Sequence, residues 1–159
     1  MVGAKFKIIT NTQLKKIGTR LFLYNINQKD FMKACHSYKN HIKFNQLYKN
    51  LEYDKNITYY IVTASFENYV RELFPKFVHV IGSKLNLKND KIRSLIFNCY
   101  HVSKVDALKD VGVDKIDIFY TDSIADLDLA KLSEKIYAVK GDKTTYCKDI
   151  DAFKTFFKK

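Results

Sequence analysis

From residue 57 onward, short runs of β-branched and aromatic residues alternate with segments of helical periodicity, and this alternation restricts the fold more than any other feature. Strands are expected at 57–63, 77–81, 116–120 and 136–139, a hairpin at 84–97, and helices at 65–74, 103–112, 125–133 and 149–157. A chain in which strands and helices alternate forms a parallel sheet covered by helices. Residues 55–159 are therefore predicted to fold as a three-layer α/β core.

Residues 1–54 have a different character, because helix breakers are few and apolar residues recur at helical spacing. Leu14, Ile17 and Leu21 illustrate this spacing. Asn27 follows a turn-forming segment and is typical of a residue at which a helix begins. We therefore predict three helices, which form a helical lid of residues 1–54 on the α/β core of residues 55–159.

The net charge of +11 raises the question of whether the chain binds nucleic acid. Only three of its 28 cations are arginines, whereas base recognition depends on the planar fork of arginine. The many Lys, Asn and Ile residues agree with an AT-rich genome, and lysines of this kind usually face solvent. Nucleic acid is therefore an unlikely partner. Residues 1–56 carry 11 cations against three acids, and as a lid they would attract an anionic substrate.

The three cysteines, at positions 35, 99 and 147, are odd in number and far apart in the chain. Their spacing does not match a zinc site, and it favours free, buried thiols in a reducing compartment. No apolar run reaches the ~18 residues that a membrane-spanning helix needs. We expect a cytoplasmic protein that has no membrane partner.

Polar side chains occur where two of the expected strands end. Thr63 ends the run YYIV, Asp122 follows the run IDIFYT, and Lys104 lies in the first turn of an expected helix. Each residue taken alone is typical of a helix cap or a surface lysine. Together they indicate a ligand site, because ligands of parallel sheets bind at the carboxyl ends of the strands.

Three stretches carry these residues in order: YYIVTASFENYVRELF, NCYHVSKVDAL and YTDSIADLDLAKLSEKIYAV. They resemble the second, third and fourth motifs of the haloacid dehalogenase superfamily, and the chain is similar to its phosphoserine-phosphatase-like branch with an inserted helical cap. Thr121 stands where this family usually has glycine. The resemblance implies a Rossmann-like sheet, Mg²⁺ as cofactor, and hydrolysis of a small phosphorylated metabolite through an aspartyl-phosphate.

The resemblance also implies which residues bind the phosphate group. Thr63 and the backbone amides of Ala64 and Ser65 would hold phosphate oxygens, since amides at the start of a helix are suited to bind anions. Lys104 would offset the negative charge of the phosphate and of the nucleophile. Thr63 and Lys104 are therefore the expected catalytic residues.

Two aspartates would form the metal corner in this family. Asp122 would supply a carboxylate to Mg²⁺, which binds one or two carboxylates together with phosphate and water. Asp126, four residues later, would complete the metal site or would hold Lys104 in position without contacting the ligand itself. This interpretation explains why an acidic pair stands where a strand is followed directly by a helix.

The first motif of the superfamily, a strand ending in Asp-x-Asp-Gly-Thr that supplies the nucleophile, does not occur in the sequence. In the family's strand order, this strand is the central one of the sheet. We therefore expect a gap between strands 57–63 and 116–120, for which the segment KFKIIT (5–10) is the local candidate substitute.

Three functional hypotheses follow from this absence. The first is an N-terminally truncated phosphatase that is inactive alone and has its first motif on a separate N-terminal segment. The second is a non-catalytic relic that binds phosphate or a protein partner. The third, a basic nucleic-acid-binding module, is the weakest, because arginine is scarce and no nucleic-acid motif is present.

Overall fold

The N-terminal region is helical in a computed structural model that describes residues 9–158. It contains α1 (Asn11–Gly18), a π-helical turn η1 (Thr19–Leu23), α2 (Gln28–Lys39) and α3 (Gln46–Lys49). Asn27 caps α2 by accepting a hydrogen bond from the Lys29 amide, which confirms the predicted start of that helix. Most of the segment KFKIIT lies outside the described residues, and its last two residues are not in a strand.

The first sheet has the order β1-β2-β3 and contains β1 (Tyr60–Phe66), β2 (His79–Lys88) and β3 (Lys91–Phe97). Strands β1 and β2 are parallel, whereas β2 and β3 form the expected antiparallel hairpin. Its turn residues Asn89 and Asp90 have φ angles of 52° and 57°, the left-handed region that Asn and Asp tolerate in tight hairpins. The short helix α4 (Glu67–Arg71) follows β1.

The second sheet has the order β4-β5-β6 and contains β4 (Ile116–Thr121), β5 (Ser133–Lys140) and β6 (Lys143–Cys147). Strands β4 and β5 are parallel, and β5 and β6 are antiparallel. The helices of this half are α5 (Val102–Lys109), the 3-10 turn η2 (Ile124–Asp126), α6 (Leu127–Ala130) and α7 (Ile150–Phe156).

The prediction of a mixed α/β protein is confirmed, but the expected single parallel sheet is replaced by two three-stranded sheets. Each sheet combines one parallel and one antiparallel pair. Within residues 9–158, β1 pairs only with β2 and β4 pairs only with β5, so these two strands are edges. No described strand pairs with both β1 and β4, and the two sheets are therefore not joined by hydrogen bonds between strands.

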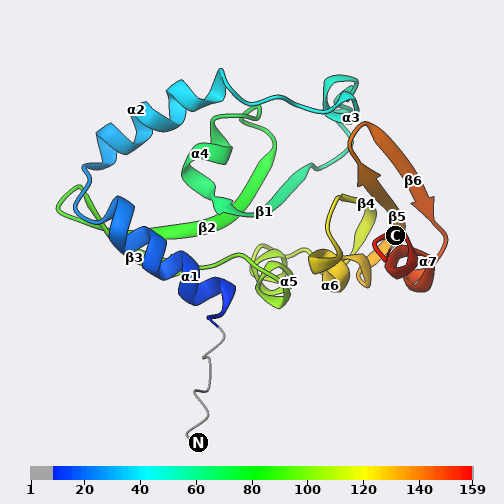
Figure 1. Ribbon diagram of the computed structural model, residues 1–159. Helices are drawn as coiled ribbons and strands as arrows, with labels where there is room; N and C mark the ends of the chain where they lie inside the picture. Colours follow the sequence, from blue (N-terminus) through cyan, green and yellow to red (C-terminus); the bar gives the residue numbers. More distant parts are fainter. Residues whose placement is uncertain (1–8, 159) are drawn as a thin grey trace, which may run out of the picture.

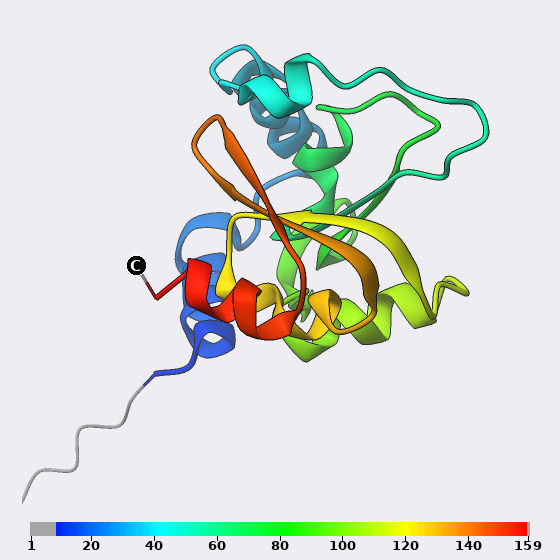
Figure 2. The same ribbon diagram turned by 90° about the vertical axis from the view of Figure 1, so that its right-hand side faces the viewer.

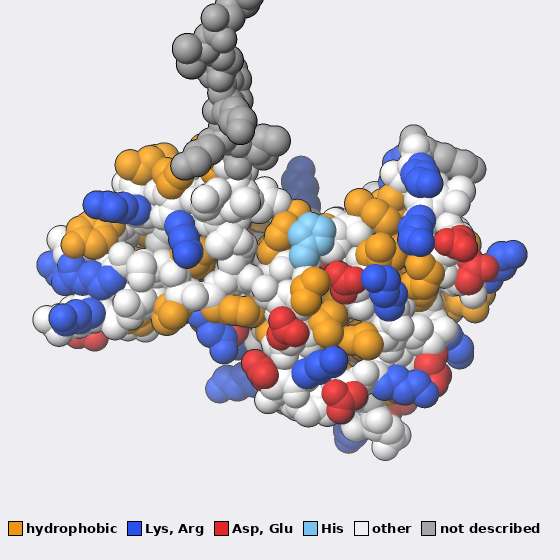
Figure 3. Space-filling view, turned by 90° about the horizontal axis from the view of Figure 1, so that it is seen from below, with side chains coloured by type: hydrophobic (Ala, Val, Ile, Leu, Met, Phe, Trp, Pro, Cys, Tyr) orange, Lys and Arg blue, Asp and Glu red, His pale blue; other side chains and the backbone are white. Residues whose placement is uncertain are grey.

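The helices lie at two ends of the molecule. Both views place α5, α6 and α7 in a row along one side of the strands, whereas α2 and α3 lie at the opposite end (Figures 1 and 2). The face seen from below is divided by charge: most visible Asp and Glu side chains lie over the half with β4–β6, and the other end shows mainly Lys and Arg (Figure 3).

One hydrophobic core joins the two sheets. Its buried members come from β2, α5, α6 and the segment before α5; they are Ile81, Cys99, Val105, Leu108 and Leu129. Val62 of β1 and Phe119 of β4 pack against this cluster from either side. A second cluster around the fully buried Phe153 fixes α7 on β5 and β6. The two sheets are therefore parts of one packed unit.

The three cysteine thiols are free and buried, as the sequence predicted. Among the described residues, no helix has the length and apolar character needed to cross a bilayer.

Candidate functional site

A buried ion pair lies at the carboxyl end of β4. The Nζ atom of Lys104, in the first turn of α5, is 2.5 Å from Oδ1 of Asp126, and both side chains are about nine-tenths buried. Thr121, the last residue of β4, donates its hydroxyl hydrogen to Oδ2 of Asp126 over 2.8 Å. Both carboxylate oxygens of Asp126 are therefore occupied, and this carboxylate fixes the position of the lysine.

The Thr121 hydroxyl also shapes the turn that follows β4. Its oxygen accepts a hydrogen bond from the Ser123 amide, and the Ser123 side chain caps the next turn through the Ala125 amide. These bonds place Asp122, which lies between them in the chain, on the surface. Asp122 thus has an exposed side chain and directly follows Thr121, the hydroxyl partner of Asp126.

Asp122 lines a cavity of about 420 Å³ that extends from the ends of β4 and β5 to α3. Tyr120, Thr121, Val139 and Gly141 line it from the strands, and Asn45 and Leu47 line it from the helical region. The backbone amide of Gln46 donates to Asp142, just after β5, over 2.9 Å and holds α3 in place. The helical region therefore covers the edge of the sheet at which Asp122 lies.

Thr63 does not end a strand as predicted, because β1 continues to Phe66 and α4 begins at Glu67, without Ser65 as its cap. The register of β1 against β2 is irregular between Val62 and Phe66, so residues 63–65 form a bulge. In this bulge the Ser65 amide donates to the Thr63 hydroxyl oxygen over 3.1 Å. One of the two expected phosphate-binding amides is thus already paired.

A lysine that the sequence did not single out lies beside this bulge. Lys15 of α1 places its Nζ atom against the carbonyl oxygen of Ala64, the hydroxyl oxygen of Ser83 at 2.7 Å and the Oδ1 atom of Asn98 at 3.3 Å. These three acceptors are uncharged, and burial lowers the pKa of Lys15. Nothing marks this lysine among the 25 in the chain, because its partners are 49 to 83 residues away.

Cys99 lies between the bulge and the ion pair. Its amide donates to the Ser83 hydroxyl oxygen over 3.1 Å. Burial raises the pKa of the Cys99 thiol to about 11, although the charges of Lys104 and Lys15 act in the opposite direction. The thiol is therefore neutral near pH 7 and contributes to the core without acting as a nucleophile.

The structure thus brings four of the named residues into one corner, namely Lys104, Thr121, Asp122 and Asp126. Residues 63–65 form a separate group beside Lys15, and the charges of both Lys15 and Lys104 act on the core residue Cys99. No three His, Cys, Asp or Glu side chains within residues 9–158 lie together as a metal site. Asp122 fits a hard cation such as Mg²⁺ as one oxygen ligand, with the remaining ligands to come from elsewhere.

Residues 19–131 match the family of haloacid dehalogenase-like hydrolases, whose members generally use Mg²⁺. The match covers more than half of the chain and includes Thr63, Lys104, Asp122 and Asp126. No match was found among curated proteins or among solved structures. The chain belongs to the haloacid dehalogenase-like hydrolase family.

Proposed function

We propose that this chain carries the phosphate- and metal-binding part of a phosphatase that acts on small phosphate monoesters. One observation carries the proposal: Asp126, held by Thr121, fixes the buried Lys104 ammonium at the end of β4, and the next residue of the chain after Thr121, Asp122, has an exposed side chain. A fixed cation and a free carboxylate at the carboxyl end of a parallel strand are suited to a phosphate ester and a divalent cation.

Each of these residues would have a separate role in the hydrolysis of the phosphate ester. Lys104 would face the phosphate group and offset its charge, and Asp126 would act as a positioning residue for this lysine. Asp122 would hold Mg²⁺, which when bound would neutralise charge on the transferring phosphate. Thr63, with the amide of Ala64, would contribute hydrogen bonds to the phosphate oxygens of a ligand that reaches from the corner to the group beside Lys15.

The nucleophile of this mechanism is the first aspartate of an Asp-x-Asp-Gly-Thr strand, and the 159 residues contain no such sequence. We propose that a strand of this kind pairs with the free edges of β1 and β4. Both strands contact the shared core, since Val62 of β1 and Phe119 of β4 pack against it. A strand between them would end close to Thr63 on one side and Asp122 on the other.

A second candidate is a protein that binds phosphate or a protein partner without turnover. Both oxygens of Asp126 have protein partners, and the described residues hold no three-ligand metal cluster. An arrangement with a single free carboxylate would favour weak metal binding over catalysis. This candidate predicts binding of phosphate that does not lead to hydrolysis under any condition.

Titration calorimetry with Mg²⁺ in the presence of inorganic phosphate tests the role of Asp122. The Asp122→Asn variant should bind Mg²⁺ at least about tenfold more weakly, because one carboxylate ligand loses its charge. Asp117→Asn is the matched control, since Asp117 is an exposed aspartate of the same strand that lies outside the cavity. Equal binding by the wild type and Asp122→Asn would remove Asp122 from the metal site.

A further inference from the structure

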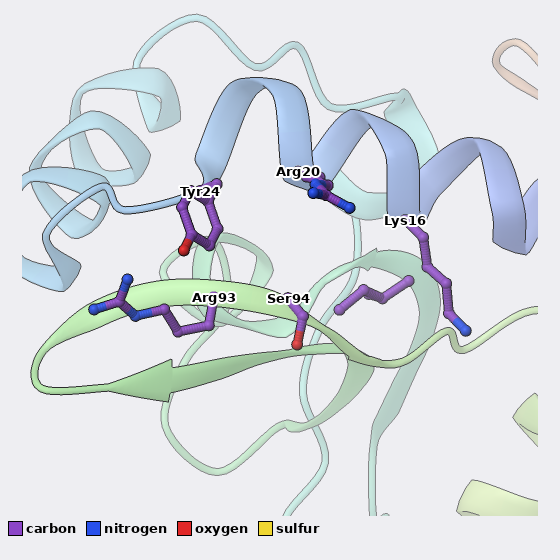
Figure 4. A pocket seen from close by; sticks show the side chains of 6 residues that line it. Lys16, Arg20, Tyr24, Arg93 and Ser94 are labelled. Atoms are coloured by element: carbon purple, nitrogen blue, oxygen red, sulfur yellow. The ribbon is translucent and has the colours of Figure 1, made fainter.

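A groove separate from the Asp122 cavity lies between the N-terminal helices and the edge of the hairpin. Its volume is about 530 Å³, and it is lined by Lys16, Arg20 and Tyr24 on one side and by Arg93, Ser94 and Leu95 on the other. Figure 4 shows Lys16 and Tyr24 extending downward from the helical wall, with Arg20 between them on the same wall, and Arg93 and Ser94 projecting from β3. The two cavities share no lining residue.

The charge of the groove is entirely positive. Three of its six lining residues are cations, and none is acidic. Lys16, Arg20 and Tyr24 are spaced four residues apart, so they form one stripe along α1 and η1. Arg20 and Arg93, two of the three arginines of the chain, both line this groove, although 25 of the 28 cations are lysines. Arginine is the side chain best suited to hold phosphate oxygens.

One hydrogen-bond donor of the Arg93 side chain has no acceptor among the described residues. Its Nη1 atom donates to the Asn25 side chain over 3.1 Å, and its guanidinium carbon lies 5.6 Å from the centre of the Tyr24 ring. Its Nε atom is buried and has no hydrogen-bond partner among the described residues. A buried donor without an acceptor is unfavourable. An oxyanion in the groove would satisfy this donor.

The walls of the groove are tied together by backbone hydrogen bonds, so the groove is formed before a ligand arrives. The Asn25 amide donates to the Ile92 carbonyl oxygen over 2.7 Å, and the Ile92 amide donates to the Ile26 carbonyl oxygen over 2.9 Å. Asn25 has a φ of 67°, which turns the chain from η1 onto β3. A preformed site loses less conformational entropy when its ligand binds.

We propose that this groove binds a small molecule that carries two or more phosphate groups. The cations stand on both walls of the groove, and a diphosphate, which is longer than a single phosphate group, can contact both walls at once. The volume is in the range of small-molecule sites. The proposal goes beyond the phosphatase function and does not depend on it, because its residues lie outside the Asp122 corner.

Titration calorimetry with pyrophosphate at fixed ionic strength tests the proposal. The wild-type chain should bind pyrophosphate more tightly than inorganic phosphate, and Arg20→Gln/Arg93→Gln should weaken pyrophosphate binding at least about tenfold. Lys16→Gln, which changes an exposed side chain, should weaken it in the same direction. Lys109→Gln/Lys148→Gln is the matched control, since it removes two exposed cations outside the groove and should leave binding unchanged.

Two results would overturn the proposal. One is pyrophosphate binding that the Arg20→Gln/Arg93→Gln variant retains in full while the Lys109→Gln/Lys148→Gln variant loses it. The other is the absence of pyrophosphate binding together with tight binding of a single-stranded RNA oligonucleotide, which would identify an extended nucleic-acid surface. The Lys16→Gln variant keeps the test valid if the double arginine variant does not fold.

Discussion

At the scale of single residues, the ion pair between Lys104 and Asp126 is the feature on which the proposed site depends most. Asp126→Ala would leave the Lys104 ammonium buried without its counter-charge. Removing one partner of a buried pair typically costs about 3–5 kcal/mol. The free energy of unfolding measured with urea should therefore fall by about this amount.

Asp128→Ala is the control for this prediction. Asp128 also forms an ion pair, with Lys131 at 2.8 Å, but the lysine of this pair is exposed. An exposed pair contributes about 0–1 kcal/mol, so this variant should remain close to the wild type. If Asp126→Ala and Asp128→Ala lower the free energy of unfolding equally, the Lys104–Asp126 pair is not the buried contact that positions the proposed catalytic lysine.

The residues of the candidate site could be predicted from the sequence only in part. Lys104, Asp122 and Asp126 could be named because they stand at fixed distances from recognisable strand and helix patterns. The contact of Asp126 with Lys104 was one of the two roles expected for Asp126. The contact of Lys15 with Ala64 could not be predicted, because it spans 49 residues and no local pattern specifies a contact of that length. The sequence also did not reveal that the Lys104 and Asp126 side chains are both about nine-tenths buried.

At the scale of secondary-structure elements, α4 and β2 approach each other closely at Gly82. A Cβ atom at this position would lie 2.9 Å from the backbone N and Cα atoms of Glu67 and from the Ser65 carbonyl oxygen. Backbone atoms cannot move aside at low cost, so Gly82→Ala should lower the free energy of unfolding by about 1–3 kcal/mol. Urea denaturation measures this loss.

Gly18→Ala is the matched substitution for Gly82→Ala. Gly18 is helical, and a Cβ atom there would meet nothing within 4 Å. Alanine favours the helix by up to about 1 kcal/mol over glycine, so this variant should be more stable than the wild type. A loss of stability at Gly18 equal to that at Gly82 would show that close packing of α4 on β2 is not the cause.

Most elements were predictable, and those that differ have local causes. The hairpin turn at Asn89 and Asp90 was foreseen because these residues tolerate the left-handed conformation. The start of α4 was placed too early, since the pairing of Phe66 with Ser83 extends β1 beyond Thr63. Strand β6 was missed because four of its five residues are exposed and lack an alternating apolar pattern.

At the scale of the whole molecule, two half-sheets share one core, and within the described residues 9–158 β1 and β4 are edge strands. The sequence could predict that these strands would not pair with each other, because the family's order places another strand between them. It could not predict that the sheets would each add an antiparallel strand. We propose that a nucleophile strand between β1 and β4 would complete the active site of a phosphatase.

Hydrolysis of p-nitrophenyl phosphate with Mg²⁺ tests this claim most directly. The chain of 159 residues should be inactive, since loss of a nucleophile alone can cost ~10⁶ in rate. The same chain joined to a strand ending in Asp-x-Asp-Gly-Thr should be active, and either Asp122→Ala or replacement of the first aspartate of that strand should abolish the activity. Activity of the 159 residues alone that Asp122→Ala abolishes, or an inactive but folded joined chain, would contradict the claim.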